Sequence, residues 1–119
     1  MNQFSVNKET LRIDVTSTSL IRAYFRGRSA LEQADTVFVP LFDKLIADAR
    51  QKGFHVHLHF EELEFFNSST ISSLLRCILA MRDRGVRTMI RYDGRQKWQQ
   101  AFFEGLAMLR GGDFEVRSV

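Results

Sequence analysis

Hydrophobic and polar residues change their spacing once in the middle of the chain, close to residue 67. Between Phe54 and Phe60 every second residue is apolar and the residues between them are histidines, a pattern typical of a β-strand with one buried face. Beyond residue 70 the apolar positions recur every three or four residues, as on an amphipathic helix. This spacing predicts one buried stripe made of Ile71, Leu74, Leu75, Ile78 and Leu79. The middle of the chain is therefore expected to be a strand, a short acidic turn and a helix.

Short strands are also expected before and after this unit. Apolar runs predict them at Leu11–Val15, Leu20–Phe25 and Val86–Tyr92, and a last edge strand around Phe114 and Val116. The residues between the first two runs are Thr and Ser only, which is turn material, so these two strands are expected to form a hairpin.

Two further helices are expected. The first opens at Asp35 or Thr36 and ends near Gly53, and Pro40 inside it predicts a later start or an irregular first turn, because proline cannot donate a backbone hydrogen bond. The second is closed by Gly111-Gly112 and carries its apolar face on Trp98, Phe102, Leu106 and Leu109.

Alternating strands and helices predict the fold class directly. The order favours a single α/β domain over residues 1–119, with a mixed β-sheet packed with about three to four α-helices. At 119 residues, 45% of them hydrophobic, the chain is long enough to bury its own core.

Four small hydrogen-bonding residues stand where the acidic turn meets the central helix: Asn67, Ser68, Ser69 and Thr70. A short side-chain oxygen at this point accepts hydrogen bonds from backbone N–H groups that the first helical turn leaves without partners. Asn67, Ser68 or Ser69 fits the capping position, and the spacing does not choose among them. Capping alone would account for all the hydroxyls.

The segment that runs from the strand into this cluster resembles the STAS domain family, the fold of bacterial anti-sigma factor antagonists. That family carries an apolar strand, a Leu-x-Phe segment, then Asp-Ser-Ser-Gly and a helix; here Leu63, Glu64 and Phe65 precede Asn67–Thr70. Asn in place of Asp and Thr in place of Gly are departures from the pattern. They are more similar to the SiaC-like branch of regulatory phosphoproteins, matched by Asn67 to Ile71.

The resemblance implies a STAS-like fold and a non-enzymatic signalling role in a bacterial partner-switching pathway. In the family, a partner serine kinase phosphorylates the serine after the Asp or Asn, and a PP2C-type phosphatase reverses the reaction. By position this serine is Ser68, with Ser69 as the fallback. The implied target is an anti-sigma factor kinase or a diguanylate cyclase. The implied docking surface comprises Asn67, Ser68, Ser69, Thr70, Ser72, Ser73 and Arg76.

A phosphate at this position is physically suited to a switch. The free N–H groups and the positive end of the helix dipole favour an anion, so the fold tolerates it. The group nevertheless adds about −1.5 to −2 charge at pH 7 to the docking surface. Glu61, Glu62 and Glu64 are close in sequence, so the phosphate is expected to deepen an acidic patch.

Two other functions compete with this one. The domain could be a STAS subunit that assists a transporter or binds a small molecule or lipid, with the serine purely structural. Alternatively, His55, His57 and His59 share one face of a strand and could hold a metal, although the sequence places no Cys or further carboxylate to complete the site. A half-buried amphipathic strand explains the same histidines.

The remaining features exclude more than they suggest. The net charge of +3 is spread over many positions, and aromatic residues rarely accompany the arginines, so neither nucleic acid nor an anionic membrane is an expected partner. Cys77, the only cysteine, is expected to be a buried small apolar residue. No secretion signal or membrane-spanning run is visible, which favours the cytoplasm. No cofactor is expected, and a homodimer is left open.

Overall fold

The computed structural model describes residues 2–108 and 114–119 as seven strands and three helices. The elements follow one another as β1 (Asn2–Lys8), β2 (Leu11–Ser17), β3 (Ile21–Ser29), α1 (Asp35–Lys52), β4 (Val56–His59), β5 (Leu63–Phe66), α2 (Ser68–Asp83), β6 (Thr88–Tyr92), α3 (Lys97–Ala107) and β7 (Phe114–Ser118). The predicted α/β class with a mixed sheet is confirmed. Leu109 and Gly111-Gly112, expected to end the last helix, lie outside the described residues.

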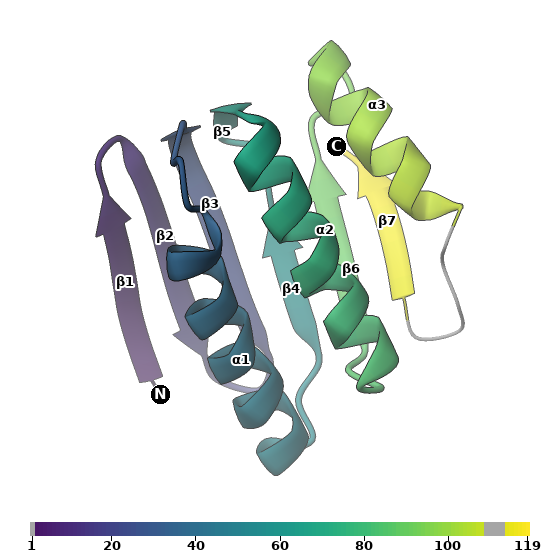
Figure 1. The fold of residues 1–119 in the computed structure, drawn as a ribbon. Helices are drawn as coiled ribbons and strands as arrows, with labels where there is room; N and C mark the ends of the chain where they lie inside the picture. Colours follow the sequence, from purple (N-terminus) through teal and green to yellow (C-terminus); the bar gives the residue numbers. More distant parts are fainter. Residues whose placement is uncertain (1, 109–113) are drawn as a thin grey trace.

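The strands form a single sheet in the order β1-β2-β3-β4-β6-β7, with β5 also paired to β3. The pairs β1–β2 and β2–β3 are antiparallel, which confirms the hairpin, and all later pairs are parallel. All three helices lie against one face of this sheet, so the molecule has two layers (Figure 1). No helix of the described residues covers the other face of the sheet.

Strand periodicity decides what each face carries. Along β2, β3, β4 and β6 the residues toward the helices are buried and almost all apolar, while those between them are mostly polar and, apart from the buried His59, exposed or half-buried. Aromatic rings fill the centre of the core. The Phe25 ring stacks on that of Phe60 with 4.4 Å between centroids, and Phe60 contacts Phe103 at 5.0 Å.

Two strands were not predicted. β1 adds an edge next to β2, and β5 occupies the segment expected to be only the Leu-x-Phe approach to the central helix. β3 pairs with β4 through residues 21–24 and with β5 through residues 27–29, and its register shifts between Gly27 and Arg28. Gly27 has φ +88°, and a Cβ there would lie 2.1 Å from the Thr10 carbonyl oxygen. Glycine is therefore required at the point where β3 turns toward β5.

α1 begins at Asp35 and contains Pro40, so the expectation of a later start is wrong and that of an irregular first turn is confirmed. The amides of Thr36 and Val37 donate to carbonyls only three residues back, at 3.1 and 3.0 Å, which is 3₁₀ rather than α geometry. The helix ends as expected at Gly53, in the left-handed conformation.

The predicted buried stripe of α2 is partly wrong. Leu74 and Ile78 are buried, but Ile71 is 37% exposed and Leu75 and Leu79 are only half-buried. The buried side of the helix is rotated toward small side chains, because Thr70, Ser73 and Cys77 face the core together with Met81. Ser73, expected off the stripe, is therefore inside it. An apolar strip of α2 is consequently left at the surface.

Candidate functional site

Asn67 is the residue that caps α2, which resolves the alternatives that the sequence left open. Its Oδ1 accepts hydrogen bonds from the Thr70 amide at 3.0 Å and from the Thr70 hydroxyl at 2.8 Å. Its Nδ2 donates to the Leu31 carbonyl at 3.0 Å, and its amide donates to the Ser29 carbonyl at the end of β3. One side chain thus fixes both the start of the helix and the segment that leads into α1.

The hydroxyls of Ser69 and Thr70 are committed to the fold. Ser69 Oγ donates to the Glu32 carbonyl at 3.0 Å and accepts from the Ala34 amide at 3.2 Å. The Thr70 hydroxyl is fully buried and lies 2.6 Å from the Ser29 hydroxyl. Neither group is free for chemistry without breaking a contact of α2, which Ser69 makes with the segment before α1 and Thr70 makes with the end of β3.

Ser68 differs from both. It is the first residue of α2, it is exposed, and its hydroxyl makes no hydrogen bond with any residue that the structure describes. The unpaired N–H groups of the first helical turn and the positive end of the helix dipole lie next to it. A charged group at this position would meet a favourable backbone field and would displace no internal contact.

A surface strip of apolar residues continues from Ser68 along α2. Ile71, Leu75 and Leu79 follow it at intervals of three, four and four residues, which places all four on one side of the helix. Ser69 and Arg76 lie about 100° around the helix from this line, on the side toward α1. We call Ser68, Ile71, Leu75 and Leu79 the α2 strip; α2 itself lies between α1 and α3 (Figure 1).

The flank toward α1 is polar. Arg76 forms an ion pair with Asp35 at 2.6 Å, and both side chains are more than half exposed. Beside this pair lies a depression of about 370 Å³ between the segment at residues 32–36 and α2, with Ser69 and Ser72 on its wall. Ser72 and Arg76 are exposed and can contact a partner protein. Thr70 and Ser73, which were also expected on the docking surface, are buried.

The acidic patch expected around Ser68 does not form as a cluster. The Glu61 carboxylate lies 3.5 Å from His59 Nδ1, and Glu62 pairs with Arg26 at 2.5 Å. Because both histidine and arginine belong to the helix-free face of the sheet, these two carboxylates are directed away from α2. Their closeness to Ser68 in the sequence therefore does not place these two carboxylates beside Ser68 in the structure.

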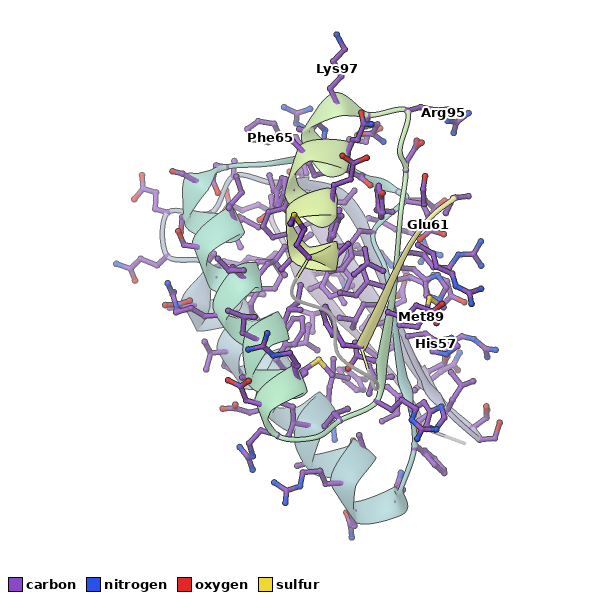
Figure 2. All side chains as sticks on the ribbon, turned by 90° about the vertical axis from the view of Figure 1, so that its right-hand side faces the viewer. His57, Glu61, Phe65, Met89, Arg95 and Lys97 are labelled. Atoms are coloured by element: carbon purple, nitrogen blue, oxygen red, sulfur yellow. The ribbon has the colours of Figure 1, made fainter. Side chains whose placement is uncertain are left out.

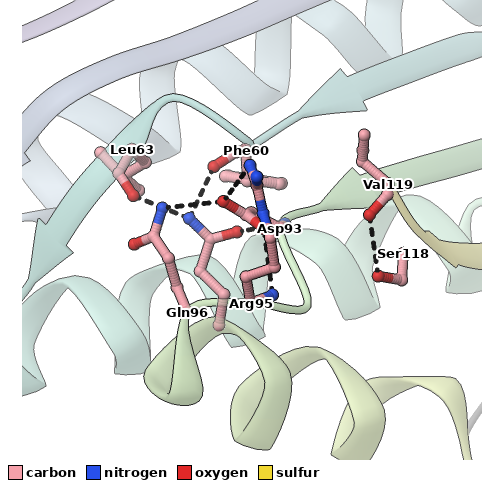
Figure 3. Close-up of polar contacts among 8 residues, drawn as sticks. Phe60, Leu63, Asp93, Arg95, Gln96, Ser118 and Val119 are labelled. Atoms are coloured by element: carbon pink, nitrogen blue, oxygen red, sulfur yellow. Dashed lines mark hydrogen bonds and ion pairs between the residues drawn. The ribbon is translucent and has the colours of Figure 1, made fainter.

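A buried amide holds the corner from which β5 starts. Gln99, at the start of α3, donates from Nε2 to the carbonyls of Phe60 at 2.9 Å and Leu63 at 2.7 Å, and its Oε1 accepts from the Asp93 amide at 2.7 Å. Figure 3 shows these contacts beside the Asp93 carboxylate, which binds the Arg95 side chain. The sequence analysis did not single out Gln99, since a lone Gln on a helix carries no distinguishing pattern.

Cys77 is buried as expected, and burial raises the pKa of its thiol to about 11. Among residues 2–108 and 114–119, no three His, Cys, Asp or Glu side chains are close enough to bind a metal ion together. In the same residues, no helix is both long and apolar enough to cross a membrane.

No protein-family model matches the chain, and no curated protein is similar to it in sequence. Several solved structures share its fold. SiaC of Pseudomonas aeruginosa aligns over 100% of both chains with a TM-score of 0.72 and 16% identity. The complex of the diguanylate cyclase SiaD with its activator SiaC, from the same organism, contains a chain that aligns over 98% of this one and 99% of its own, with TM-score 0.68 and 16% identity.

A protein of the DUF3478 family with a SpoIIAA-like fold, from Shewanella loihica PV-4, aligns over 96% of this chain and 90% of its own, with TM-score 0.57 and 14% identity. The STAS-like fold expected from the residues around Asn67 is thereby confirmed, as is the structural similarity to SiaC. At these identities the likeness concerns the fold.

Proposed function

We propose that the chain is a non-enzymatic signalling protein that binds a partner protein through α2, and that reversible phosphorylation of Ser68 controls this binding. The observation that carries the proposal is the contrast within the Ser/Thr cluster. The Ser68 hydroxyl is exposed and without internal hydrogen bonds, while that of Ser69 is tied to the segment before α1 and that of Thr70 to the end of β3. A kinase can reach Ser68 without unfolding the helix start.

The α2 strip supplies the docking surface. Ile71 is one of only four large hydrophobic side chains that are strongly exposed in the described part of the chain, and Leu75 and Leu79 extend it along the helix. An apolar strip of this kind is a common element of protein interfaces. A phosphate on Ser68 would place about two negative charges at one end of the strip, so a partner that buries the strip would have to desolvate them.

The proposed regulators are a cognate serine kinase and a PP2C-type phosphatase, acting in the cytoplasm. For the target, a diguanylate cyclase is favoured over an anti-sigma factor, because a structurally similar protein, SiaC, is an activator found in complex with the cyclase SiaD. Support for this choice comes from similarity of fold, not from residues in contact.

A binding experiment with matched variants tests the proposal. Wild-type protein, protein with phosphoserine encoded at position 68, Ile71→Glu and Val39→Glu are immobilised, and retained proteins from native cells are quantified by mass spectrometry. Val39 is 38% exposed and lies on α1, so it matches Ile71 in exposure but not in place. The proposal predicts a target that wild type and Val39→Glu retain and that both phosphoserine 68 and Ile71→Glu lose.

The retained target is then purified and its affinity for the same four proteins is measured directly. A loss of about tenfold or more on phosphorylation is expected, equivalent to about 1.4 kcal/mol. Equal affinity of the phosphorylated and unphosphorylated proteins for every retained target would refute the switch. Binding lost in Val39→Glu and kept in Ile71→Glu would move the interface to α1.

A further inference from the structure

The helix-free face of the sheet carries an ordered array of charged and aromatic side chains. Strand register places Arg22, His57 and Met89 in one row across β3, β4 and β6, and Tyr24, His59 and Arg91 in the next. Figure 2 shows His57 and Met89 on the side of the sheet away from the helices. We call Arg22, His57, His59 and Arg91 the central basic patch.

Most arginines of this face are neutralised locally. Arg12 and Arg26 both bind Asp14, at 3.0 and 2.5 Å, and Arg117 binds Glu115 at 2.6 Å. By contrast, Arg22 and Arg91 form no ion pair with any residue in the described ranges, although both are half-buried. Two positive charges in the middle of the sheet are therefore left without a compensating carboxylate.

Two histidines lie between these arginines and supply no negative charge. Burial, reinforced by the neighbouring His59 and by Arg22 and Arg91, lowers the pKa of His57, and burial together with the same arginines lowers that of His59 despite Glu61. His59 is only 9% exposed, its ring is stacked on Tyr24 with 4.5 Å between centroids, and its Nε2 has no hydrogen-bond partner in the described structure. An external anion would compensate Arg22 and Arg91 and would favour the protonated form of His59, in which Nε2 donates a hydrogen bond.

The helix-free face has two depressions, one on each side of the central basic patch. A depression of about 270 Å³ beside His57 is lined by Met89 and Arg117 among others, and another of about 490 Å³ is lined by Thr16, Tyr24 and Arg26. The central basic patch lies between these two depressions. The surface thus extends across the strands, with the apolar Met89 on one side of the charged centre and mostly polar side chains on the other.

We propose that the helix-free face binds an acidic segment of a partner protein, which crosses β3, β4 and β6 with its carboxylates on Arg22 and Arg91 and an apolar side chain against Met89. Guanidinium groups bind carboxylates in a two-pronged geometry that suits this role. A nucleic-acid strand fits less well. A base needs a free aromatic face to stack on, and the Tyr24 ring is already stacked on His59, with the Arg26 guanidinium 5.1 Å from its centroid.

The test uses a fluorescein-labelled peptide of alternating Glu and Leu, its counterpart with Gln for Glu, and an oligothymidylate of equal length. Binding to the full chain is followed by fluorescence anisotropy at low and high salt. The Glu-Leu peptide is expected to bind more tightly than the other two probes and to weaken as salt rises. Arg22→Gln and Arg91→Gln are each expected to weaken it about tenfold. Arg50→Gln, which removes the same charge from the exposed end of α1, is the matched control.

Every outcome bears on the proposal. Tighter binding of the oligothymidylate, equal binding of the Gln peptide, no binding of any probe, or equal losses in Arg50→Gln and Arg22→Gln would overturn it. Arg22→Lys keeps the charge and is expected to retain part of the affinity, which guards against a variant that merely fails to fold. Because α2 lies on the opposite face, Ser68→Asp is expected to bind the peptide as wild type does. A negative result for the peptide would therefore leave the proposed Ser68 switch unaffected, and a negative result for the switch would leave the peptide site unaffected.

Discussion

Negative charge introduced along the Ser68–Thr70 cluster is expected to have a position-dependent effect on stability. Ser68→Asp places a carboxylate on the first residue of α2, where the helix dipole contributes about 0.3–1 kcal/mol in its favour and no internal contact is lost. Ser69→Asp loses the bond that the hydroxyl donates to the Glu32 carbonyl, and sets a carboxylate against that oxygen, at a cost of about 1–2 kcal/mol.

Thr70→Asp is the severe case. The Thr70 side chain is fully buried and its hydroxyl lies between Ser29 and Asn67 Oδ1, which is itself an acceptor. A carboxylate at this position would be desolvated and would face another oxygen, so a loss of about 3–5 kcal/mol in the free energy of unfolding is expected. For a domain of this size, whose total stability is about 5–15 kcal/mol, that change brings the protein close to unfolding.

Urea unfolding of the three variants, followed by circular dichroism, measures these differences. Ser68→Asn is the control for Ser68→Asp, because it keeps the shape and removes the charge, and added salt is expected to reduce the difference between them. A loss above about 2 kcal/mol in Ser68→Asp, or a Thr70→Asp protein as stable as wild type, would refute the structural basis of the switch.

Three further predictions concern groups away from the cluster. Gln99→Met, which keeps the shape but cannot hydrogen-bond, is expected to lower the free energy of unfolding by about 2–4 kcal/mol, because the Phe60 and Leu63 carbonyls and the Asp93 amide lose their partner; an unchanged urea midpoint would contradict this. Burial and the raised pKa of the Cys77 thiol predict that a thiol reagent at pH 8 reacts with the unfolded but not the folded protein; rapid labelling of the folded protein would contradict it. The lowered pKa values of His57 and His59 mean that the folded state binds fewer protons than the unfolded state, so stability is full above about pH 6.5 and falls as the pH drops below it. His57→Gln is expected to reduce this dependence, and an identical pH profile would disprove the assignment.

The sequence predicted most of the fold because its strongest periodic segments are those that face the core. The alternation at residues 54–60 and the three-to-four spacing of α1 are consequences of burial on one side. β1 escaped prediction because Phe4 and Val6 are its only apolar residues and both are only partly buried. β5 escaped because a four-residue strand contains too few positions to show a period.

The α2 strip was missed for a physical reason as well. A helical wheel predicts that Ile71 and Leu75 are buried and that Thr70 and Ser73 are exposed. In the structure, the segment before α1 and the end of β3 lie so close to the first turns of α2 that small polar side chains occupy the buried side of the helix. The buried side of α2 is therefore determined by the close approach of these neighbouring segments and not by the hydrophobicity of its residues. The same contacts make Ser68 the free hydroxyl, and no property of the local sequence distinguishes Ser68 from Ser69.

Site mapping of phosphate in protein purified from native cells tests the central claim most directly. Trypsin releases residues 53–76 as one peptide that contains all the candidate hydroxyls, and fragmentation in the mass spectrometer locates a phosphate within it. The account predicts a single phosphate on Ser68, which disappears in Ser68→Ala without moving to a neighbour. A phosphate on Ser69 or Thr70, or a peptide that remains unmodified under every growth condition, would contradict it.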